Sequence, residues 1–268
     1  MKKTTNKLII ITTIILLAIV VFLLVIFLVA TLNGKIGYKL GLINLGTGNS
    51  KLIIGQTFES KNVKKIDIKQ NAGKIIFKES PDQNITVEIY GDDENIVDIA
   101  LNDYTLNIDY TKQKKFAFIN FGTPRNDIIV YIPANHQVEI NLVNDYGECN
   151  IIDLENAEVN INCGAGDVIL GKIKNATIKC DFGNIKIKEV LNKCDIESDF
   201  GNIEIDCILI LENSRIKTDM GNVEIDETND IYINANCDMG SVDINNNNRN
   251  SKVELKIESD CGNIEVNN

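Results

Sequence analysis

From about residue 58 onward, hydrophobic residues recur at every second position in short runs. One run places isoleucine at Ile185 and Ile187, and the next repeats it at Ile203 and Ile205. The residues between them are mostly Lys, Glu, Asp and Asn. A period of two is typical of β-strands that bury one face and keep the other in water. Outside the N-terminal segment no helical periodicity is present, so the pattern predicts an all-β chain.

The strands are interrupted by a short motif, Asp-x-Gly followed by Asn or Ser. Its central residue is Phe, Met or Cys, which we expect to pack over the corner. We expect the glycine to adopt a positive φ and the aspartate to accept backbone N–H groups as an Asx-turn. Weaker copies surround Gly147 and Gly166, and Asn71–Gly73 is a distant eighth copy. The glycines of the five clear copies are Gly183, Gly201, Gly221, Gly240 and Gly262.

Neighbouring glycines from Gly147 to Gly262 are separated by 17 to 22 residues, a period typical of stacked supersecondary units. Such short units cannot bury their apolar stripe alone, but stacked at ~4.8 Å they form ladders of Ile and Val. The sequence therefore predicts a single-chain parallel β-solenoid (β-helix). Antiparallel hairpins with four-residue loops are the alternative. The copies at Gly73 and Gly166 lack the aspartate, so irregular coils are expected there.

The N-terminal segment predicts a membrane anchor. Residues 8–30 contain no charge and are long enough to span a bilayer as a helix. Lys2, Lys3 and Lys7 precede this span, which places the N-terminus in the cytoplasm and the rest outside. A cleaved signal peptide is the alternative. The predicted organisation is a cytoplasmic N-terminus (1–7), a transmembrane helix (8–30), a glycine-rich juxtamembrane connector (31–57) and the β-solenoid (58–268).

The net charge and the positions of the cysteines reduce the number of possible functions. The net charge is −11, which gives the chain no electrostatic reason to bind nucleic acid. Three cysteines lie three residues before turn glycines, and Cys149, Cys194 and Cys207 lie at inward strand positions, so we interpret the cysteines as small core residues. Disulfides between stacked cysteines of neighbouring coils are the alternative in an oxidising compartment. The only histidine, His136, follows a proline turn and is interpreted as a turn residue. Zinc is not expected, because clustered ligands are missing.

Two kinds of chemistry were considered. The turn aspartates could form a calcium ladder, but the repeat differs from that of the calcium-binding β-roll, so turn caps are favoured. Short coils leave little room for the loops that carry catalytic groups, and no nucleophile or phosphate-binding motif occurs. We therefore predict no enzyme activity, no catalytic residues, no metal site and no cofactor, and the binding surface is left unassigned. The aspartates concerned are Asp181, Asp199, Asp219, Asp238 and Asp260.

The last strand ends at the C-terminus without a capping helix. An open sheet edge is expected there, and Glu265, Asn267 and Asn268 would blunt it. The region with the least regular pattern is 112–126, which we expect to form a loop.

The N-terminal span, the strand end at Ile132-Pro133 and the serial D-x-G-N-[IV]-x-[IV] turns resemble the bacterial putative-adhesin family. The resemblance covers about 58–268 and implies a single-chain β-helix. It also implies a relation to accessory membrane proteins that are encoded beside cell-envelope stress regulators in Gram-positive bacteria. The family has no established catalytic residues to transfer to this chain.

Together these observations predict a non-enzymatic, membrane-anchored, extracytoplasmic β-solenoid. Its expected function is adhesion, surface interaction or scaffolding. An accessory protein of a cell-envelope stress-response system is the alternative, and a polysaccharide-active β-helix enzyme is a remote one. The expected partners are the membrane, through the N-terminal helix, and another membrane or surface protein. The expected location is the cell membrane, with a single pass.

Overall fold

The computed structural model describes residues 39–40, 43–45, 51–91, 97–111, 119–121 and 127–267, which fall into two compact units. The smaller unit lies within residues 1–47 and 115–123. Its described part is a three-stranded sheet in which β2 (Ile43–Leu45) pairs antiparallel with β1 (Lys39–Leu40) and parallel with β9 (Ile119–Phe121). The predicted anchor at 8–30 lies outside the described residues, and within those residues no helix has the length and hydropathy needed to cross a membrane.

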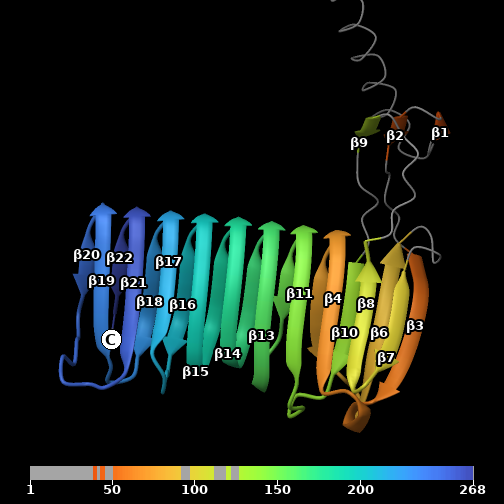
Figure 1. The fold of residues 1–268 in the computed structure, drawn as a ribbon, viewed down its shortest axis with the longest axis horizontal. Helices are drawn as coiled ribbons and strands as arrows, with labels where there is room; N and C mark the ends of the chain where they lie inside the picture. Colours follow the sequence, from red (N-terminus) through yellow and green to blue (C-terminus); the bar gives the residue numbers. More distant parts are fainter. Residues whose placement is uncertain are drawn as a thin grey trace, which may run out of the picture. The chain divides into compact units, whose positions relative to one another are not determined.

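The larger unit is built from strands and one short 3-10 helix, η1 (Ser60–Asn62), in its described part (Figure 1). The all-β prediction is therefore confirmed. The strands are β3 (Lys51–Glu59), β4 (Lys65–Ala72), β5 (Ile75–Glu79), β6 (Asn84–Gly91), β7 (Asp98–Asn102), β8 (Thr105–Tyr110), β10 (Asp127–Ile132), β11 (Glu139–Tyr146), β12 (Cys149–Ile151), β13 (Leu154–Ala165), β14 (Val168–Phe182), β15 (Ile185–Phe200), β16 (Ile203–Ile208), β17 (Ser214–Met220), β18 (Val223–Thr228), β19 (Tyr232–Met239), β20 (Val242–Ile244), β21 (Glu254–Cys261) and β22 (Ile264–Val266).

From β11 onward the sheet curls into solenoid-like coils whose strands pair in parallel. β14 and β15 flank Gly183 and pair in parallel, whereas a hairpin would pair them antiparallel, so the hairpin alternative is wrong. Successive coils align apolar residues with apolar residues and bury them, which explains the period-two pattern. One such ladder runs through Ile68, Leu142, Ile161, Ile178, Ile196, Ile216 and Ile257.

Among the N-terminal strands of this unit, β4 and β5 pair in parallel with their neighbours, but others do not. β6 lies antiparallel to both β3 and β10, and β7 and β8 form an antiparallel hairpin. Asp103 and Tyr104 have φ values of 47° and 63°, which suits the tight turn of this hairpin. The strand β3 begins at Lys51, so residues 51–57 belong to the sheet rather than to the predicted connector 31–57.

The C-terminal coils do not follow sequence order. β21 lies between β17 and β19, and β22 lies between β18 and β20. Figure 1 shows this arrangement at one end of the stack, where β19 and β20 are outermost. The predicted open edge at Glu265 and Asn267 is therefore wrong, because the last strand of the chain is paired on both sides.

Candidate functional site: the glycine corner and its exposed row

The corner of each coil is formed by a glycine that stacks on the glycine of the next coil. Gly201 has a φ of 153°, and a Cβ built there would lie 2.0 Å from the carbonyl oxygen of Gly183. The predicted positive φ is thus confirmed, and close stacking adds a second reason for glycine. Gly73 and Gly166, whose motifs lack the aspartate, have φ values of 132° and 148° and stack in the same way. The glycine thus sets the corner without the aspartate, and the expected irregularity lies along the strand instead, where the register of β13 and β14 shifts between Leu154 and Glu158.

The residue after each glycine links the coils by hydrogen bonds. Asn202 N–H donates to Asn184 Oδ1 at 3.1 Å, and Asn222 N–H donates to Asn202 Oδ1 at 2.9 Å. The asparagine ladder begins at Asp167 and ends at Ser241. The Asx-turn prediction for the aspartates is wrong: within the described chain, none of the five turn aspartates accepts a backbone N–H. Instead, the side-chain oxygen of the asparagine accepts a backbone N–H from the next coil.

The position three residues before the turn glycine carries Cys, Ser or Thr in every coil from Gly166 to Gly262. Thr218 Oγ1 donates to Gly201 O at 3.4 Å, and Ser259 Oγ donates to Gly221 O at 3.4 Å. Cys237 Sγ lies 2.8 Å from Gly262 O. This explains why Cys, Ser and Thr alternate at one position: each is small and each can donate to the carbonyl of a stacked glycine.

All seven cysteines are free thiols, and four of them are buried. Burial raises the pKa of the Cys194 thiol to about 12, and a hydrogen bond with Cys149 raises the pKa of Cys163 to about 12. Both therefore stay protonated at neutral pH and are poor nucleophiles. Cys207 is only partly buried, so its predicted inward position is wrong.

The Tyr, Phe or Met before a turn glycine is exposed to solvent and is not buried over the corner as expected. The side chains of Phe182 and Phe200 are 56% and 42% exposed, and their rings stack with centroids 5.0 Å apart. In the order of the coils this position forms what we call the corner row: Tyr146, Ala165, Phe182, Phe200, Met220, Cys261 and Met239. The sequence shows Phe or Met at four of these seven turns, but only the stacking shows that the seven positions form one row.

Aspartates precede most members of the corner row and form an acidic rim beside it. Asp219 is paired with Lys217, and both side chains remain partly exposed. No group of three or more His, Cys, Asp or Glu residues is placed to hold a metal ion in the described structure. The rim consists of Asp145, Asp181, Asp199, Asp219, Asp260 and Asp238, and it supplies negative charge beside apolar side chains.

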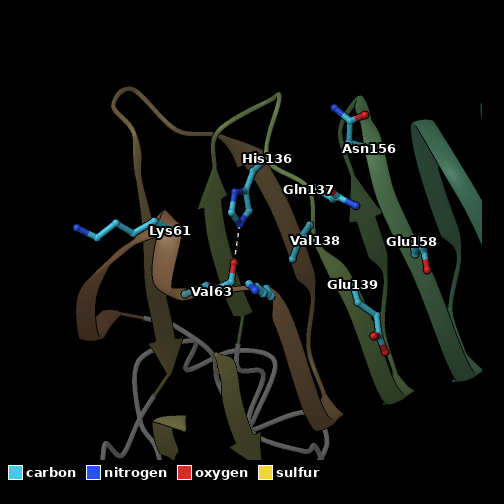
Figure 2. A pocket seen from close by; sticks show the side chains of 9 residues that line it. Lys61, Val63, His136, Gln137, Val138, Glu139, Asn156 and Glu158 are labelled. Carbon is cyan, nitrogen blue, oxygen red and sulfur yellow. Dashed lines mark hydrogen bonds between the residues drawn. The ribbon is translucent and has the colours of Figure 1, made fainter. Parts of the chain in front are cut away.

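A cavity of about 500 Å³ lies at the other end of β11, where Glu139 begins the strand (Figure 2). His136 Nε2 lies 2.7 Å from the carbonyl oxygen of Val63, so Nε2 carries the proton and donates it. Lys65 pairs with Glu139 at 3.0 Å, and this hydrogen bond lowers the pKa of Glu139. The His136–Val63 hydrogen bond and the Lys65–Glu139 ion pair are both structural contacts between strands. This agrees with interpreting His136 as a turn residue.

Comparisons with known proteins identify the family of this chain. A family model described as Toastrack DUF4097 matches residues 63–268. A putative adhesin from Bacteroides fragilis is 18% identical over 80% of this chain and 96% of its own, with a TM-score of 0.48. A putative lipid binding protein from Parabacteroides distasonis is 14% identical over 84% of this chain and 99% of its own, with a TM-score of 0.42. No curated protein matches the chain.

Proposed function

Because this chain belongs to the Toastrack DUF4097 family, we propose that it is a non-enzymatic surface-interaction protein. In this proposal the stacked coils form one parallel β-solenoid, which a single N-terminal transmembrane helix holds outside the cell. The solenoid presents the corner row to a partner on the outer side of the membrane.

The corner row carries this proposal. Five of its seven members are large apolar side chains that are 42–67% exposed, and they are aligned by the register of the sheet. Single exposed apolar residues are ordinary on protein surfaces, but a contiguous row is typical of an interaction site. A stack held together by glycine contacts and an asparagine ladder supports that row on a rigid scaffold.

The location rests on the sequence. The uncharged segment 8–30 follows three lysines, which favours an inward N-terminus and an outward solenoid. The acidic surface is compatible with such a place, because it gives the protein solubility without attraction to nucleic acid.

Protease treatment of intact cells tests the proposal. We expect a C-terminally tagged full-length chain to remain in the membrane pellet and to lose its tag to external protease, while a cytoplasmic marker stays intact. A tag protected in intact cells would contradict the outward orientation. Recovery of a shorter soluble form that begins after Ala30 would contradict the anchor.

A further inference from the structure

We propose that the corner row binds a basic amphipathic α-helix of a partner protein, laid along the axis of the stack. The inference deepens the proposed function and rests on it, since it names the chemistry of the partner for the same surface.

The length and spacing of the row favour a helix. Seven members at a strand spacing of ~4.8 Å extend over ~29 Å. A helix of about 19 residues has the same length, at 1.5 Å per residue. Each helical turn advances 5.4 Å, close to one coil, so side chains at i, i+4 and i+7 meet successive members of the row. A strand places same-face side chains ~6.8 Å apart, which matches the coils less well.

The composition of the row favours a protein partner. Tyr146, Phe182, Phe200, Met220 and Met239 are of the types enriched at the centres of protein interfaces. Methionine side chains adapt to irregular apolar surfaces, so the Met end of the row can fit a helix without a preformed pocket.

The charge of the acidic rim favours a basic partner over an acidic one. The acidic rim accompanies the row from Asp145 to Asp238, and among the described residues Asp219 is the only one of these aspartates that pairs with a lysine. Lysine or arginine along the border of an apolar helical stripe that faces the rim would complement it. A second copy of this chain would instead bring two acidic rims together.

A model peptide tests the proposal on the full-length chain in zwitterionic lipid nanodiscs, with the signal from empty nanodiscs subtracted. The probe is a fluorescent 19-residue peptide of leucine and lysine whose leucines form one helical stripe, followed by fluorescence anisotropy. Two reference peptides have glutamate in place of lysine, or the same residues rearranged with a period of two.

We expect saturable binding of the leucine–lysine helix, weakened at least tenfold in the double variant Phe182→Ser, Phe200→Ser. The double variant Asp181→Asn, Asp199→Asn should bind more weakly and lose part of the salt dependence. Leu211→Ser serves as the control, because Leu211 is 69% exposed but lies outside the row. Melting followed by circular dichroism checks that each variant is folded.

Equal binding of the glutamate peptide, or equal binding of the rearranged peptide, would overturn the proposal. So would an affinity that is unchanged in the folded phenylalanine variant, which would place peptide binding elsewhere or in the lipid. A solenoid shown to face the cytoplasm would overturn the proposed function while leaving peptide binding intact, so the two failures are distinguishable.

Discussion

At the scale of single residues, the corner glycines meet two separate requirements. Their φ values of 132–159° are rarely adopted by residues with a side chain. In addition, the carbonyl oxygen of the stacked glycine occupies the place of a Cβ. A substitution therefore strains its own backbone and pushes the neighbouring coil away, and the two costs add.

Gly201→Val should lower the free energy of unfolding by well over ~1 kcal/mol, because a β-branched residue is a severe outlier at this φ. Urea unfolding of the full-length chain in nanodiscs measures the effect. Gly55→Val is the matched control: a Cβ at Gly55 meets no atom within 4 Å, and valine favours strands. Equal midpoints for the two variants would contradict the stacking requirement.

Asp153 predicts a pH-dependent contribution to stability. It accepts hydrogen bonds from Lys188 Nζ at 2.8 Å and from Lys172 N–H at 2.9 Å, and these lower its pKa. A lowered folded-state pKa stabilises the fold above the unfolded pKa of ~3.9, and this contribution is lost as pH falls through the folded-state value. Asp153→Asn should therefore melt slightly below wild type at pH 7 and equal to it near pH 2. A difference that persists at pH 2 would contradict this assignment.

At the scale of strands and turns, the asparagine ladder joins neighbouring coils at the place where sheet hydrogen bonds are interrupted. Each asparagine accepts the backbone N–H of the asparagine in the next coil, so the turn is held from outside its own strand. The side chain at this position therefore stabilises an interface between elements rather than the turn that contains it.

Asn202→Ala should destabilise the chain by about 0.5–1.5 kcal/mol, because the N–H of Asn222 loses its acceptor. Asn202→Asp places a carboxylate oxygen where the amide oxygen was, so this variant should lose much less stability. Thermal melting of the two variants measures the difference. A larger loss for the aspartate variant would show that the amide group, and not the acceptor, is required.

The strands and the turn glycines could be predicted from the sequence because each depends on local pattern. Alternation at Ile203 and Ile205 gives a buried face, and Gly201 gives a corner. The order of the coils could not be predicted. Each coil presents nearly the same Ile and Val stripe to its neighbours, so the stripe alone does not distinguish β21 from β19 as the partner of β17. The corner row was missed for a related reason, since its exposure depends on how turns stack.

At the scale of the whole solenoid-like unit, the outermost coil is protected by its own loop. Asn247 pairs with Ile233 through two hydrogen bonds: its Oδ1 accepts the N–H at 2.9 Å and its Nδ2 donates to the carbonyl at 2.8 Å. Asn248 N–H donates to Ile231 O at 3.1 Å. A side-chain amide thus replaces a missing strand, and Ser241 ends the asparagine ladder at the same coil. These contacts reduce the tendency of the edge to pair with another chain.

The inserted C-terminal coil makes the outer coil depend on it. The sheet partners of β19 and β20 are β21 and β22, so deletion of residues 251–268 removes them. We expect amide hydrogen exchange in 232–244 to rise to the level of an unfolded segment, while β13–β15 remain protected. Ile257→Asp, which places a charge in the buried ladder between β17 and β19, should do the same in the full-length chain. The outward-facing variant Glu265→Gln is the control. If residues 232–244 stay protected after the deletion, β19 has moved onto β17, and the order of the coils is set by the inserted strand rather than by β19 itself.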